Sequence, residues 1–146
     1  MAQVNDPAAL VAPSLDDMQA MAQHAFAHIP SALAAHVDGV VIRVEDFPDA
    51  ETEREMGLDS PFDLLGLYSG VALGEKSVSD APQHVDMIFL YRRPILDFWC
   101  ETGEDLHHLI RHVLVHEIGH HFGFSDADME AIEASADQMD NWEIMH

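Results

Sequence analysis

The chain contains few basic residues: six lysines and arginines stand against 27 aspartates and glutamates, for a net charge of −21 over 146 residues. A surface this acidic repels phosphate groups, so the composition argues against a nucleic-acid partner. The simplest role of such a charge is solubility. If the charge also guides recognition, it favours a basic peptide or protein as the partner.

Cysteine and long apolar runs are also scarce. Cys100 is the only cysteine, which excludes an intrachain disulfide and is typical of a reducing compartment. We expect it to be a small buried side chain. No apolar run approaches the roughly 20 residues of a membrane helix, and the segment after Met1 lacks the basic and apolar regions of a signal peptide. These absences predict a cytoplasmic protein without membrane association, and we expect a monomer.

The length suits one domain, and 48% apolar residues are enough to form its core. Residues 1–13 contain two prolines and few large apolar side chains, so we predict a flexible N-terminal arm. Residues 14–137 form the predicted domain, and residues 138–146 a short C-terminal tail. Ser14 and Asp17 resemble a capping box, and the apolar spacing that follows predicts a helix that ends before Pro30.

Three apolar or β-branched segments predict strands: residues 40–44, an edge strand at 64–71 that is weakened by glycines, and a central strand at 85–91 that ends by Pro94. The acidic segment 46–61 is predicted as a loop with one helical turn. Residues 104–122 are apolar nearly all round, which predicts a buried helix. The pattern therefore predicts an α+β domain, in which about three or four strands pack on this helix and its flanking helices.

Residues 116–126 read HEIGHHFGFSD and lie at the end of the predicted buried helix. His116 and His120 project from one side of that helix, one turn apart, where two imidazoles can bind one zinc ion. Glu117 lies about 100° round the helix from His116. This carboxylate is therefore placed to act on a zinc-bound water rather than to bind the metal. Two histidines in a buried helix need a partner, and a metal ion provides one.

The third ligand must come from the chain beyond this helix. Gly123 has the conformational freedom for a sharp turn, after which Asp126 is the predicted ligand. Two alternatives remain open. Asp126 could serve only as a first-turn acid after a capping Ser125, and Glu130 or Glu133 of the following helix could bind the metal instead. Gly123 favours the shorter route through Asp126.

Other histidines of the same helix are predicted to play supporting roles. His121 points about 100° away from His120, so we expect it to pack rather than bind the ion. His112 and His108 continue the row of histidines backwards, but each step of four residues turns by about 40°. We expect His112 to contact a metal ligand or a local partner.

This motif resembles the zinc site of zincin metallopeptidases, and its HExxHxxGxxD form resembles metzincin-type sites with an aspartate ligand. In size and order of elements, the chain resembles the small bacterial zincin-like metallopeptidase family, most strongly over residues 64–130. The resemblance implies a minimal zincin domain with a mixed sheet. It also implies that His116, His120 and Asp126 bind one zinc ion and that Glu117 is the general base and acid.

The resemblance further implies a hydrolase, a zinc peptidase that cleaves peptide bonds through a zinc-bound water. The strand at 65–71 would border the cleft, where an extended peptide can pair with it. The chain departs from larger metzincins in two ways: Met139 and Met145 are the only candidates for a methionine turn, and no tyrosine follows the helix. The alternative is therefore a zinc-binding regulatory or interaction module with little or no proteolysis. A third possibility is an acidic interaction protein in which the motif is incidental.

Overall fold

The structure is a computed structural model that describes residues 11–70 and 85–134. Most of the predicted arm and all of the predicted tail lie outside this range. The described elements follow one another as α1 (Leu15–Ala27), α2 (Ser31–Ala34), β1 (Val41–Glu45), α3 (Ala50–Met56), the 3-10 helix η2 (Pro61–Asp63), β2 (Gly66–Ser69), β3 (Met87–Tyr91), α4 (Arg92–Thr102) and α5 (Leu106–His121). Residues 126–134 form a further helix, here called the C-terminal helix, which reaches the limit of the described range.

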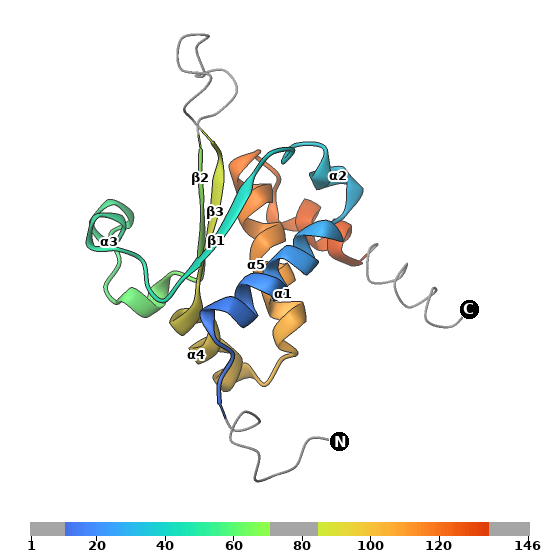
Figure 1. The fold of residues 1–146 in the computed structure, drawn as a ribbon. Helices are drawn as coiled ribbons and strands as arrows, with labels where there is room; N and C mark the ends of the chain where they lie inside the picture. Colours follow the sequence, from blue (N-terminus) through green and yellow to red (C-terminus); the bar gives the residue numbers. More distant parts are fainter. Residues whose placement is uncertain (1–10, 71–84, 135–146) are drawn as a thin grey trace, which may run out of the picture.

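The sheet has the strand order β1-β3-β2, with β1 parallel and β2 antiparallel to β3. This mixed sheet among helices confirms the predicted small α+β domain. β3 is the central strand and β2 an edge strand, as the sequence predicts. α1 and α5 lie side by side on one face of the sheet, whereas α3 lies apart from them on the other side (Figure 1).

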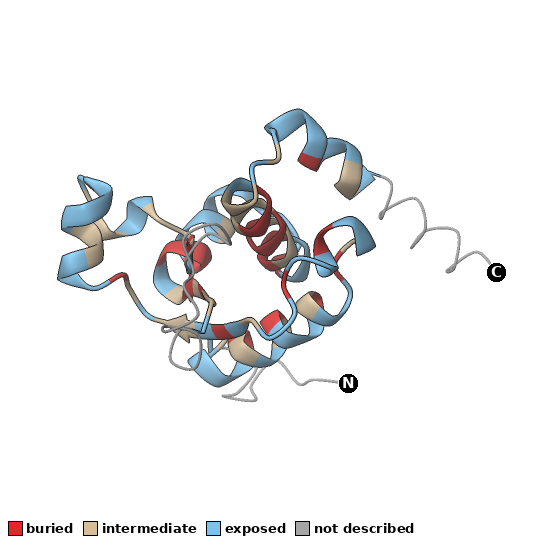
Figure 2. Ribbon diagram, turned by 90° about the horizontal axis from the view of Figure 1, so that it is seen from above, coloured by how far each residue is buried: buried red, intermediate tan, exposed pale blue. Residues whose placement is uncertain are grey.

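The core forms between α5, α1 and the sheet. Buried residues gather toward the centre of the molecule, and exposed segments surround them (Figure 2). α5 contributes apolar side chains from most of its circumference, which confirms the predicted buried helix. Its fully buried residues include Leu109, Ile110, Leu114 and Ile118. The histidines at the end of this helix therefore stand on a rigidly packed element. No helix in the described ranges is long and apolar enough to cross a membrane.

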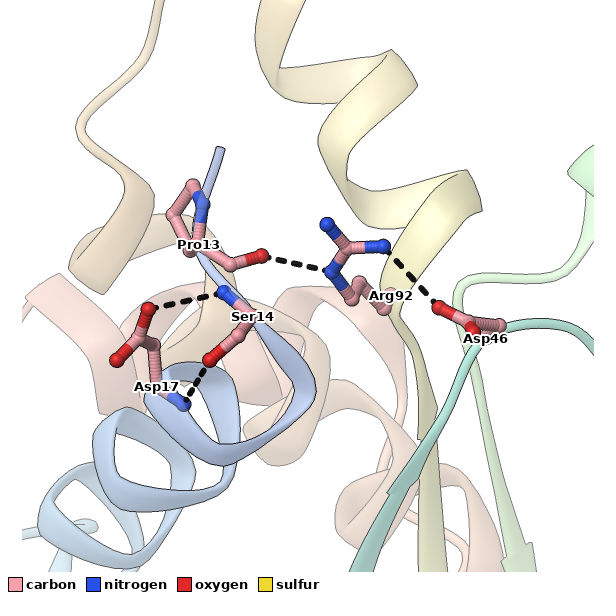
Figure 3. A network of polar contacts seen from close by, with 5 residues as sticks. All are labelled: Pro13, Ser14, Asp17, Asp46 and Arg92. Atoms are coloured by element: carbon pink, nitrogen blue, oxygen red, sulfur yellow. Dashed lines mark hydrogen bonds and ion pairs between the residues drawn. The ribbon is translucent and has the colours of Figure 1, made fainter. Parts of the chain in front are cut away.

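Arg92 joins three parts of the chain at the start of α4 (Figure 3). Its Nε donates a 2.7 Å hydrogen bond to the carbonyl of Pro13, and a terminal nitrogen contacts Asp46 Oδ1 at 3.1 Å. Next to Pro13, Ser14 and Asp17 form the predicted capping box at the start of α1. The side chain of Arg92 thereby ties the entry of α1 to the segment that follows β1.

Pro94 marks the largest error in the predicted secondary structure. We expected it to end the central strand, but β3 ends at Tyr91 and Pro94 lies in the first turn of α4. A proline costs little there, because the first N–H groups of a helix have no intrahelical partner. The helix that follows was not predicted. Cys100 lies on it and is exposed, so the expected burial of this side chain is wrong.

Two helix starts also differ from the sequence predictions. The segment 46–61 contains more than one helical turn, since α3 is a seven-residue helix whose cap Asp49 accepts a 2.8 Å hydrogen bond from Thr52 N. α5 begins at Leu106 rather than 104. Asp105 caps it by accepting a 3.0 Å bond from His108 N, so this acid precedes the first turn instead of lying in it.

Candidate metal centre

The end of α5 and the turn after it bring the predicted ligands together. Gly123 adopts the left-handed conformation, with φ of 84°, and Phe124 N donates a 2.8 Å hydrogen bond back to Gly119 O. The chain then reverses into the C-terminal helix. His120 Nε2 and Asp126 Oδ1 lie 3.0 Å apart. The potential ligand atoms of His116, His120 and Asp126 all lie within 4.8 Å of one another.

Ser125 explains how the reversal is stabilised. Its hydroxyl accepts a 3.1 Å hydrogen bond from Asp128 N, and its own N–H donates to Asp128 Oδ2 at 3.1 Å. This reciprocal pair is a capping box, so the predicted cap at Ser125 is confirmed. The capping carboxylate belongs to Asp128. Asp126 is left with its side chain 79% exposed and directed to His120.

His116 provides the test of whether a metal suits this group. Its Nε2 atom is buried and has no hydrogen-bond partner within residues 11–70 and 85–134. Burial, reinforced by the neighbouring His112, lowers the pKa of His116 and favours the neutral imidazole, which is the form that binds metals. A buried nitrogen lone pair without a donor is costly. Two imidazoles and a carboxylate are a donor set that suits zinc with one position left open.

Glu117 lies beside this group on the side of the sheet. Burial raises the pKa of its carboxyl, while His120 and the main-chain N–H of Tyr68 partly offset that rise. Tyr68 belongs to the edge strand β2. The carboxylate therefore interacts with one predicted ligand, His120, and with the edge strand.

The register of β2 determines what its edge presents to Glu117. Tyr91 N donates to Leu65 O at 3.0 Å, so these two residues form a hydrogen-bonded pair. Such pairs alternate along an antiparallel ladder. Gly66 and Tyr68 are therefore non-hydrogen-bonded positions, whose main-chain N–H and C=O groups point away from β3 toward the open edge.

Tyr68 also organises the aromatic side chains around the site. Its hydroxyl donates a 2.9 Å hydrogen bond to Asp86 Oδ2, and its ring stacks on His121 with centroids 3.9 Å apart. Burial, followed by the bond to Asp86, raises the pKa of Tyr68 well above its usual range. His121 belongs to neither potential metal group of the described residues. Its stacking agrees with the packing role that we predicted. The contribution of Tyr68 was missed, because it depends on contacts between strands and α5.

A second potential metal group adjoins the first. It consists of His112, His116 and Glu133, whose potential ligand atoms also lie within 4.8 Å of one another. One carboxylate oxygen of Glu133 lies 3.2 Å from His112 Nδ1, and the other lies 3.9 Å from His116 Nε2. The expected contact between His112 and a local partner is thus present. Of the alternative ligands, Glu133 reaches His116, whereas Glu130 is exposed and belongs to neither group.

Met129 is a structural feature that the sequence analysis missed. It is fully buried in the C-terminal helix and packs against Gly119 of α5. A Cβ atom added at Gly119 would lie 2.2 Å from Met129 Sδ, so the two helices approach closely only because this residue is glycine. A glycine inside a helix is unfavourable by itself and could have suggested such a contact. Met139 and Met145, the methionines that we considered, lie outside the described residues.

A family model described as a zincin-like metallopeptidase matches residues 37–136. The match covers more than half of the chain and includes β1, α5 and the turn to Asp126. The chain belongs to the zincin-like metallopeptidase family. No curated protein matched the sequence. Membership of this family confirms the resemblance inferred from the motif, and it supports a peptidase class and zinc as the metal.

Proposed function

We propose that this protein is a zinc-dependent peptidase in which His116, His120 and Asp126 bind one zinc ion and Glu117 is the general base. The observation that carries the proposal is the position of Glu117. Its carboxylate interacts both with the imidazole of His120 and with the main-chain N–H of Tyr68, which belongs to β2 at the edge of the described sheet. A base in this place can serve a peptide that lies along the strand.

The chemistry follows from these neighbours. Zinc, when bound, polarises the scissile carbonyl and lowers the pKa of the attacking water. Glu117 takes the proton from that water and passes it to the leaving amine. The raised pKa of Glu117 suits both steps, because the carboxyl is a stronger base than an ordinary glutamate and still an effective acid. An extended peptide that pairs with the outer edge of β2 would hold its scissile bond near Glu117.

The acidity of the chain supports a basic peptide or protein as the substrate. With 27 acidic residues against six basic ones, long-range attraction favours positively charged segments and disfavours nucleic acids. We also propose a cytoplasmic location, because the one cysteine, Cys100, is a free thiol on the surface.

Replacing Glu117 by alanine tests the proposal. The purified wild type and the variant are compared for zinc content and for cleavage of a defined peptide mixture by mass spectrometry. Glu130→Ala is the matched control, because Glu130 is an exposed glutamate of the next helix and belongs to neither metal group. We expect stoichiometric zinc in all three proteins, and a loss of cleavage of about 10²–10⁴-fold in Glu117→Ala alone.

Two outcomes would contradict this proposal. A Glu117→Ala variant that cleaves as fast as the wild type would remove Glu117 from the reaction. A wild-type protein that carries zinc but cleaves no peptide would favour the alternative, a zinc-binding regulatory or interaction module.

A further inference from the structure

The end of α5 contains the HxxxH spacing twice. Residues 112–120 read HVLVHEIGH, so His116 is the second histidine of one pair and the first of the next. The rings of His112 and His116 lie with centroids 4.0 Å apart. Both pairs therefore present two imidazoles one turn apart, which is the spacing that allows two histidines to bind one ion.

Each histidine pair meets its own carboxylate. Asp126 comes from the turn after α5 and lies against His120, whereas Glu133 comes from the C-terminal helix and lies against His112 and His116. The two oxygens of Glu133 divide between the imidazoles, one at 3.2 Å and the other at 3.9 Å. Two imidazoles and one carboxylate again form a donor set that suits a divalent transition-metal ion.

Burial indicates that Glu133 needs a positive partner. Its side chain is only 15% exposed, compared with 79% for Asp126. A carboxylate withdrawn from water is costly unless a cation or hydrogen-bond donor compensates it. The buried Nε2 of His116 faces Glu133 without a hydrogen bond. A metal ion between them would satisfy both groups, and His112, at 44% exposure, leaves the position accessible from solvent.

We propose that His112, His116 and Glu133 form a second metal site, which competes with the His116–His120–Asp126 site for a single zinc ion. Competition follows because the Nε2 atom of His116 has one lone pair and can bind one ion at a time. Glu117 directly follows the first histidine of its pair, His116. In the second pair that position, directly after His112, is Val113, which is buried and apolar. An ion held there has no adjacent base and is catalytically silent. This silence rests on the proposed role of Glu117, whereas metal binding at the second site does not.

The second site is tested in a protein that lacks the first. His120 and Asp126 are exposed, with side chains at 55% and 79%, so replacing both by alanine should leave the core intact. We expect the His120→Ala/Asp126→Ala variant to retain stoichiometric zinc after dialysis and to give a cobalt(II) absorption spectrum that differs from that of the wild type. Adding Glu133→Gln should abolish both signals. Adding Glu130→Gln is the matched control, and it should abolish neither.

Circular dichroism establishes that each variant is folded. If the His120→Ala/Asp126→Ala variant unfolds, the His120→Asn/Asp126→Asn variant is used in its place. A folded double variant that holds neither zinc nor cobalt would overturn the second site. So would a Glu133→Gln addition that leaves metal binding unchanged.

The failure of this inference can be told apart from the failure of the proposed peptidase. If the wild type binds zinc but cleaves no peptide, the peptidase proposal fails while the metal measurements still test the second site. If the double variant is metal-free and the wild type is active, only the second site fails.

Discussion

Replacing Gly119 by alanine should weaken zinc binding, although Gly119 is not itself a predicted metal ligand. A Cβ atom at this position would lie 2.2 Å from Sδ and 2.9 Å from Cγ of Met129. Met129 is fully buried, so its side chain has little space to yield. The C-terminal helix must therefore move away from α5. Asp126 starts that helix and Glu133 lies further along it, so both carboxylates should move away from the histidines.

At an ordinary helix position Gly→Ala stabilises the protein, whereas at this tight contact it should not. Alanine is favoured over glycine inside a helix by about 1 kcal/mol. Overpacking a tight interface costs about 1–3 kcal/mol. The two effects predict a variant that is between about equally stable and roughly 2 kcal/mol less stable than the wild type. If the same strain opposes zinc binding, a cost of up to about 2 kcal/mol lowers the zinc affinity by up to about 30-fold, since each tenfold step corresponds to about 1.4 kcal/mol.

Urea unfolding of the metal-free protein and competition with a zinc chelator measure the two effects. Met129→Ala provides the matching background, because it removes the side chain that the new Cβ would meet. Truncating Met129 alone should cost about 2–5 kcal/mol. In that background Gly119→Ala should become neutral or stabilising, which is the coupling expected of residues in contact. A Gly119→Ala variant that is about 1 kcal/mol more stable than the wild type, with unchanged zinc affinity, would refute the reasoning.

Three further changes have definite outcomes. Burial raises the pKa of Glu117, so the folded protein binds this proton more tightly than the unfolded chain, and stability falls as pH rises from the unfolded to the folded pKa. Glu117→Gln should therefore raise the melting temperature of the metal-free protein at pH 7, and the gain should be smaller below about pH 4. A variant with a lower melting temperature than the wild type at pH 7 would contradict this. Peptide cleavage should peak at neutral to mildly alkaline pH, because an aspartate ligand offsets part of the zinc charge and the pKa of the attacking water is then lowered less. A peak below about pH 5, where histidines protonate and release zinc, would count against the site. Arg92→Met should lower the free energy of unfolding by about 1–3 kcal/mol, because charged hydrogen bonds are lost, and it should leave zinc affinity unchanged. Arg93→Met is the control, since Arg93 is exposed and its contact over Phe47 is worth about 0.5–1 kcal/mol. Equal losses of stability in both variants would reject this role of Arg92.

Several parts of the fold and the site could be predicted because they depend on residues close in sequence. Ser14 and Asp17 predicted the start of α1, and the three strand segments appear with the expected central and edge positions. α4 was missed because Pro94 suggests the end of an element by itself. Only the preceding strand, which ends at Tyr91, shows that this proline occupies the first turn of a helix.

The sequence by itself determined the pair His116 and His120, the turn at Gly123 and the family. Helix geometry sets the distance between residues four apart, and a left-handed glycine sets the direction of the turn, so neither depends on the rest of the chain. The tertiary structure alone decided that Glu133 reaches His116 and that Tyr68 borders Glu117. Those contacts join residues many positions apart, and they exist because the C-terminal helix and β2 pack against α5 at specific distances. No local spacing encodes these distances; they result from the burial of apolar side chains such as Met129 across the whole domain.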